Sequence, residues 1–226
     1  MAYQWDFTPV LANTPLLAQG LLNTLKVTGA SLVCGLALGL VLALLRLSPR
    51  RWLAVPAGFI IEVFRTTPPL VQLFWFFFAL PLIVGIEMTP FMAAIVTFSI
   101  QSAAFFAEVF RAGIVSIERG QWDGALAIGM SRRQALARIV LPQAVKRMIP
   151  AFLERSIELM KTTTLVATIA YADLLFEANE ISQKTFRPLE TFTVVALIYF
   201  VVIFAFSLLA RQFERRLAVS GESTVH

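Results

Sequence analysis

Four long stretches without a charged residue constrain this chain more than any other feature of its sequence. They extend from Val27 to Leu45, Thr66 to Ile86, Met88 to Ala107 and Thr191 to Ala210. A helix of about 20 residues rises roughly 30 Å, which matches the hydrocarbon thickness of a bilayer. Backbone groups in lipid have no water to bond, so each stretch is predicted to be a transmembrane helix.

A fifth span is predicted from about residue 148 to 170, although charged residues occupy its first half. Composition agrees with a membrane protein, because only 15% of residues are charged against about 25% in soluble domains. We therefore expect an all-α membrane protein with one transmembrane domain over residues 1–226. Its spans are expected at approximately 20–45, 57–82, 88–111, 148–170 and 191–213, with a long loop at about 115–145.

Basic residues gather in alternate loops of this predicted topology. They follow the first, third and fifth spans, whereas the other loops carry few: Arg46, Arg50, Arg51; Arg111, Arg119, Arg132, Arg133, Arg138, Lys146, Arg147; Arg211, Arg215, Arg216. Lysine and arginine favour cytoplasmic loops. The N-terminus is therefore predicted outside and the C-terminus in the cytoplasm. This pattern also explains the net charge of +5 without invoking nucleic acid.

Several kinds of chemistry are excluded by what the sequence lacks. Cys34 is its one cysteine and His226 its one histidine, so neither a disulfide framework, a His/Cys metal site nor a Ser-His-Asp triad is expected. It also has no Gly-x-x-x-x-Gly-Lys-Ser/Thr loop to hold nucleotide phosphates. We expect a chain that is not an enzyme and binds no cofactor or metal itself.

The loop at about 115–145 is predicted to contain two short amphipathic helices. Residues Gln121 to Ile128 and Ser131 to Val140 have helical patterns, with Gly129 between them and Ser131 as a suitable N-cap. Glycine can supply the unusual backbone angles that such a break needs. Amphipathic helices of this kind either lie on lipid or dock a partner, and composition leaves both open.

The residues of this loop resemble the EAA loop of binding-protein-dependent ABC importers. Asp123-Gly124-Ala125 is followed at the family spacing by Gly129 and by Ile139-Val140-Leu141-Pro142. The family pattern begins Glu-Ala-Ala, and the changes here keep the negative charge and a small side chain. Glu108-Val109-Phe110-Arg111-Ala112-Gly113-Ile114 and Glu62-Val63-Phe64-Arg65-Thr66-Thr67-Pro68 are similar to the polar amino acid permeases.

This resemblance implies a type I permease fold in the bacterial inner membrane. The chain would be the permease subunit of an importer for polar amino acids, and the opening Trp5-Asp6-Phe7 is similar to permeases for glutamate, glutamine and aspartate. Its implied partners are a dimer of ATPase subunits that bind ATP and Mg²⁺, a second identical or homologous permease, and an amino-acid-binding protein. The residues implied to couple the ATPase are Asp123, Gly124, Ala125, Gly129, Arg132, Leu141 and Pro142.

Polar residues at membrane depth are candidates for a substrate path, because they are costly there. An amino acid carries both charges, so a site of mixed charge suits it. The candidates are Glu158, Lys161, Thr162, Thr163, Gln72, Gln101 and Glu62. Charged groups at this depth could instead form structural ion pairs or extend to the lipid headgroups. We favour that interpretation for the neighbouring charges Glu154, Arg155 and Arg65. Thr162 also departs from the family pattern.

A different kind of transporter remains an alternative. An ion-gradient-driven carrier or channel subunit for small polar solutes would also place charges at membrane depth. Such carriers often have ten or more spans arranged in inverted repeats. The present chain has about five predicted spans and no internal repeat, which favours the importer.

Overall fold

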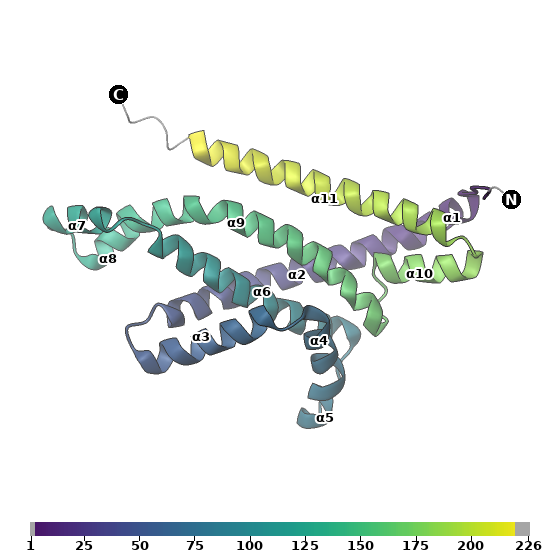
Figure 1. Ribbon diagram of the computed structural model, residues 1–226, viewed down its shortest axis with the longest axis horizontal. Helices are drawn as coiled ribbons and strands as arrows, with labels where there is room; N and C mark the ends of the chain where they lie inside the picture. Colours follow the sequence, from purple (N-terminus) through teal and green to yellow (C-terminus); the bar gives the residue numbers. More distant parts are fainter. Residues whose placement is uncertain (1–2, 220–226) are drawn as a thin grey trace. The chain divides into compact units, whose positions relative to one another are not determined.

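The computed structural model describes residues 3–219, with side chains as far as residue 212 (Figure 1). His226 and the side chains of Glu214, Arg215 and Arg216 lie outside this description. The described residues form helices and their connections, which confirms the predicted all-α class. The elements are α1 (Thr8–Ala12), α2 (Thr14–Arg46), α3 (Arg51–Thr66), α4 (Pro69–Phe74), the π-helical η1 (Trp75–Ala79), α5 (Leu80–Val84), α6 (Pro90–Val115), α7 (Arg119–Ala127), α8 (Arg132–Ala135), the π-helical η2 (Leu136–Val140), α9 (Leu141–Thr162), the 3₁₀-helical η3 (Thr163–Ile169), α10 (Leu174–Thr185) and α11 (Pro188–Val219).

Three of the described helices are long and apolar enough to cross a membrane, and there are up to five spans if each bent helix pair counts as one. The three are Thr14–Arg46, Pro90–Val115 and Pro188–Gln212. The first bent pair breaks at Thr67 and Pro68, between α3 and α4. Pro69 opens α4, where its missing N–H has no intrahelical partner in any case.

The contacts divide the chain into two units. Unit 1 contains Met1–Val33, Thr67–Ser99 and Ile157–Phe206, and unit 2 contains Cys34–Thr66, Ile100–Ser156 and Ser207–His226. Four long helices, α2, α6, α9 and α11, contribute to both. Each unit has its own buried apolar clusters, so each is described separately below.

Unit 1 is held together by apolar clusters and by polar bonds at helix ends. One cluster gathers around Val27, Leu73 and Phe98. Where α10 begins, the carboxylate of Asp173 accepts a bond from the Phe176 N–H at 2.8 Å, which caps the helix. Two hydrogen bonds and one close approach fix this cap to α2. Asn23 donates to the Ala172 carbonyl, the Leu174 N–H donates to the Thr24 hydroxyl, and Gly20 lies close to the backbone of Asp173.

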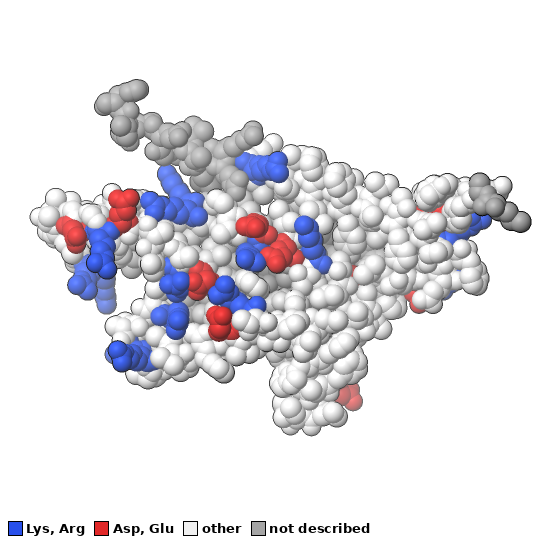
Figure 2. Space-filling view, viewed as in Figure 1, with Lys and Arg blue, Asp and Glu red and all other residues white. Residues whose placement is uncertain are grey.

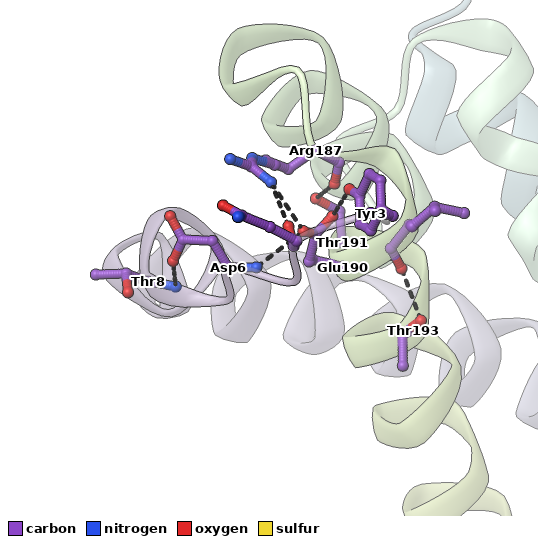
Figure 3. Close-up of polar contacts among 9 residues, drawn as sticks. Tyr3, Asp6, Thr8, Arg187, Glu190, Thr191 and Thr193 are labelled. Carbon is purple, nitrogen blue, oxygen red and sulfur yellow. Dashed lines mark hydrogen bonds and ion pairs between the residues drawn. The ribbon is translucent and has the colours of Figure 1, made fainter. Parts of the chain in front are cut away.

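A buried carboxylate joins the N-terminal segment of unit 1 to the start of α11 (Figure 3). Glu190, in the first turn of α11, is 0% exposed. Its oxygens accept bonds from the Tyr3 hydroxyl at 2.5 Å, the Asp6 N–H at 3.0 Å and the Arg187 guanidinium at 3.3 Å. Arg187 also donates to the Gln4 carbonyl at 2.9 Å. These contacts, here called the N-terminal clamp, satisfy a charge that would otherwise be costly to bury.

Unit 2 contains the close approach of α2 to α6. Ala43 of α2 packs with Ile61 of α3 and with Ala104 and Ala107 of α6. At Gly39 of α2, an added Cβ would lie 2.8 Å from the Cβ of Phe106 and 2.9 Å from the Ala103 carbonyl. Gly39 thus allows close backbone contact between helices, as small residues do in membranes.

We expect Gly39→Ala to lower the thermal stability of the protein. The methyl group would collide with backbone atoms of α6, and overpacking of this kind costs about 1–3 kcal/mol. Gly29→Ala in the same helix is the matched control, because nothing lies within 4 Å of its added Cβ. Fluorescence-detected size-exclusion chromatography after heating measures both. Equal melting temperatures for the two variants would contradict this account of Gly39.

Candidate coupling loop and cationic cavity

The end of α7 is a complete glycine-capped turn in unit 2. Gly129 has φ +86°, in the left-handed region that glycine enters without strain. Its N–H bonds to the Leu126 carbonyl at 3.0 Å, and the Met130 N–H bonds to the Ala125 carbonyl at 3.1 Å. These are the two bonds of a Schellman motif. The predicted break between two helical segments at Gly129, with a backbone conformation suited to glycine, is present.

The segment after the turn begins as predicted and ends differently. Ser131 caps α8 through a capping box with Gln134, with bonds of 3.3 and 2.8 Å. The prediction of a separate helix ending at Val140 is wrong, because α8, η2, α9 and η3 are continuous from Arg132 to Ile169. Pro142 lies in the interior of this continuous helix, where proline removes a helical hydrogen bond, and it comes directly after the π-helical η2, in which the hydrogen-bond pattern already departs from that of an α-helix.

The loop is fixed to the helices behind it. Ile117, Val140, Ala144 and Met148 form a buried cluster against which Trp122 of α7 packs. Two polar bonds reinforce the cluster: Gln143 donates to Gln121 at 3.2 Å, and Arg147 donates to the Ser116 carbonyl at 2.5 Å. A movement imposed on α7 would therefore be transmitted to α6 and α9 rather than absorbed by a flexible linker.

The outer surface of the loop combines apolar and charged side chains. Ile128, at the tip of α7, is 73% exposed, and Leu126 beside it is 39% exposed. Six of the residues predicted to couple an ATPase are exposed: Asp123, Gly124, Gly129, Arg132, Leu141 and Pro142. Ala125, the seventh, is 4% exposed and supports the loop from within. Sequence reasoning did not name Ile128 among the residues that couple an ATPase.

A cavity of about 390 Å³ lies in unit 2 between α3, α6 and α9. Figure 2 shows acidic and basic side chains interspersed over these three helices. The guanidinium carbons of Arg155 and Arg65 lie 4.6 and 5.8 Å from the ring centre of Phe105. Glu108 is held by Arg111, whose Nε donates to both carboxylate oxygens at 2.9 Å.

Sequence reasoning did not identify this cavity. It treated Arg65 and Arg155 as structural or headgroup-seeking residues, and it gave no role to Phe105 or to Arg147, which also lines the cavity. A signal was present in the spacing of Arg147, Ala151 and Arg155, which recur every four residues and therefore share one face of α9.

The candidate path residues fall into separate groups. Glu62 and Gln101 belong to unit 2, where Glu62 lies 3.7 Å from Arg65. Gln72, Glu158, Lys161, Thr162 and Thr163 belong to unit 1. Glu158 and Lys161 are exposed, and the Thr162 hydroxyl bonds back to the Glu158 carbonyl at 2.9 Å.

Two of these path candidates are engaged inside unit 1. Thr163 is 0% exposed, and its hydroxyl lies 3.1 Å from that of Thr28. Gln72 is 5% exposed and donates to the Thr67 carbonyl at 2.9 Å. These two side chains therefore join neighbouring segments of unit 1, whereas Glu158 and Lys161 present their charges outward.

Comparison with known proteins places these features in a family context. Residues 35–219 match the family model described as "Binding-protein-dependent transport system inner membrane component". The arginine transport system permease protein ArtQ of Bacillus subtilis is 35% identical over 94% of this chain and 97% of its own length. The glutamate/aspartate import permease protein GltK of Escherichia coli O157:H7 is 35% identical over 96% of this chain and 100% of its own.

A solved structure extends the likeness to three dimensions. The crystal structure of an amino acid ABC transporter with histidines contains a chain 36% identical to this one, with a TM-score of 0.90. The match covers 95% of this chain and 100% of that one. The MetNI methionine ABC transporter, at 20% identity and a TM-score of 0.77 over 91% of this chain and 98% of its own, shares the fold.

Proposed function

Because this chain belongs to the family of binding-protein-dependent transport system inner membrane components, we propose that it forms the translocation path of an ATP-driven importer for polar amino acids. It is the non-catalytic permease subunit of an amino acid ABC importer in a bacterial membrane, and ATP hydrolysis belongs to a separate subunit. Family membership also sets aside the alternative of an ion-gradient-driven carrier. We further propose glutamate, glutamine or aspartate as the substrate.

The loop around α7 is proposed to couple the ATPase to the membrane helices. The observation that carries this role is the contrast between its exposed apolar tip, at Ile128 and Leu126, and its firmly packed base, at Trp122 and Met148. A rigid helix fixed by packing transmits a rigid-body movement. When two ATPases close around ATP and Mg²⁺, each would pull the permease loop bound to it. That loop would in turn move α6 and α9 of the permease.

The proposed assembly has two permease subunits, identical or homologous, above two ATPases. A binding protein, secreted or tethered to lipid, would deliver the amino acid from outside. The N-terminus would then lie outside and the C-terminus in the cytoplasm, as the arginine clusters favour. Glu158 and Lys161 would line the path, while Thr163 and Gln72 would hold its walls.

Reconstitution tests this proposal directly. The chain is co-purified with its ATPase and second permease, placed in liposomes, and assayed with and without the binding protein and candidate amino acids. We expect ATP hydrolysis and uptake to rise together when the binding protein and its amino acid are both present. A chain that never associates with an ATPase, or uptake that needs an ion gradient instead of ATP, would overturn it.

A further inference from the structure

Asp173 of unit 1 has a buried carboxyl group that the proposed transport mechanism does not use. It caps α10 and is 0% exposed. One of its oxygens, Oδ1, accepts the Phe176 N–H at 2.8 Å. Within the described part of the chain, the other oxygen, Oδ2, is buried and has no hydrogen-bond partner. Oδ2 is therefore an open position for a ligand.

A second buried polar atom interacts with Asp173. The Tyr199 hydroxyl of α11 is coupled to Asp173 and faces Thr24 of α2, yet among the described residues it makes no hydrogen bond of normal geometry. Thr24 belongs to the same place, because its hydroxyl accepts the Leu174 N–H at 3.1 Å. Two unpartnered oxygens thus lie where α2, α10 and α11 of unit 1 meet.

The surroundings of Asp173 supply no ion-pair partner from the residues that the structure describes. The ionisable groups that interact with it are Glu177, one turn further along α10, and the phenols Tyr171 and Tyr199. Lys26, the basic residue of α2 in this unit, donates instead to an asparagine three residues before it, at 3.3 Å. A carboxylate buried without a positive partner is costly, so the neutral form of Asp173 is favoured.

We propose that Asp173 binds a proton from the outer side of the membrane, and that the loss of this proton loosens α10 from α2 and α11. Asp173 lies in the connection between the predicted fourth and fifth spans, on the side predicted to face outward. α10 is held there by apolar contacts of Leu174 and Ile181 with Leu17 of α2 and Val195 of α11. An ionised carboxyl group in this joint would draw water between the helices, because Oδ2 has no partner there.

The direction of the pH dependence follows from the burial of Asp173. Burial raises the pKa of Asp173 to about 6 from the ordinary 3.8, although the N–H groups at the start of α10 act in the opposite direction. The folded chain therefore holds the proton more tightly than the unfolded chain does. The stabilising contribution of the proton is complete below pH 3.8 and is lost as the pH rises through about 6.

Infrared spectroscopy detects the proton directly, because a neutral carboxyl group has a C=O stretch that a carboxylate lacks. The full chain, purified with its ATPase and second permease, is titrated in phosphatidylcholine nanodiscs, and the spectrum of the matching Asp173→Asn complex is subtracted. We expect a carboxyl band that disappears with a midpoint near pH 6. A midpoint no higher than 3.8, the ordinary value for aspartate, would overturn the proposal, and any higher midpoint supports it.

Two glutamates of α10 form a matched pair that assigns the band to Asp173, even if Asp173→Asn fails to assemble. The charge of Glu177 raises the pKa of Asp173, so Glu177→Gln should lower the midpoint. Glu180→Gln makes the same change three residues further on, where the carboxylate is paired with Lys184 at 3.0 Å, and should leave the midpoint unchanged. Equal midpoints in the two variants would show that the band belongs to another group and would overturn the proposal.

Hydrogen–deuterium exchange of the α10 backbone measures the loosening. Asparagine caps a helix about as well as aspartate and stays neutral at every pH. At about pH 7.5 the amides of α10 should exchange about tenfold faster or more in the wild type than in Asp173→Asn, whereas at about pH 5 the two should be alike. Equal exchange at both pH values would overturn the coupling to α10. If added Na⁺ at constant pH slows exchange in the wild type alone, the site holds a cation and the assignment of a proton is overturned.

Discussion

ATP-driven uptake is expected to fall below about a tenth of the wild-type rate when Gly129 is replaced by valine. A β-branched residue at φ +86° is a genuine outlier, and such strain costs on the order of 1–3 kcal/mol. The turn would relax by losing its Schellman bonds, and the tip of α7 would move away from its docking position. Uptake in liposomes, normalised to the amount of protein in the membrane, measures the effect.

Gly120→Val is the matched control for this change. Gly120 lies in the same helix α7, has no positive φ, and has nothing within 4 Å of an added Cβ. The substitution therefore adds the same side chain to the same loop without left-handed strain. Normal insertion of both variants, with uptake lost only in Gly129→Val, is the expected result. Full uptake by Gly129→Val would count against the turn as a coupling device.

Replacing Ile128 by aspartate should separate the permease from its ATPase without unfolding it. Ile128 is 73% exposed, and surface substitutions usually change folding stability by less than about 0.5 kcal/mol. A buried charge in an apolar contact, by contrast, should weaken association about 10- to 100-fold, the range of interface hot spots. Co-purification of the ATPase and its dissociation constant in detergent report the loss.

Ile86→Asp provides the comparison for Ile128→Asp. Ile86 is 57% exposed and lies in the connection before α6, on the side predicted to face outward. The substitution introduces the same charge in place of another exposed isoleucine, one that is remote in sequence from the loop. ATPase binding should be unchanged in this variant. If both isoleucine variants retain the ATPase equally well, Ile128 is not part of the docking surface.

The fold class and the glycine turn could be predicted from the sequence because local rules govern them. The length of each uncharged apolar stretch indicates a helix in lipid. Gly129 followed two residues later by Ser131 indicates the end of one helix and the N-cap of the next. The junction at Pro142 could not be predicted in the same way. Proline inside a helix usually ends or kinks it, and the π-helical η2 through which the helix continues to Pro142 leaves no signal in the sequence.

The remaining features depend on contacts between residues far apart in the chain. Arg65 and Arg155 look like ordinary helix charges until each is found over the ring of Phe105. Thr163 looks like a polar residue on a path until its hydroxyl is found against that of Thr28. No periodicity in the sequence encodes such pairings, because they depend on how helices pack rather than on how each one forms.

The N-terminal clamp has a consequence for how the protein is made. Tyr3 and Glu190 are 187 residues apart, so the ribosome must complete most of the chain before the two can meet. At roughly 5–20 residues per second, the opening segment waits on the order of ten seconds or more for its partner. Closure of the clamp is therefore a late event in biogenesis, because it needs the first turn of α11.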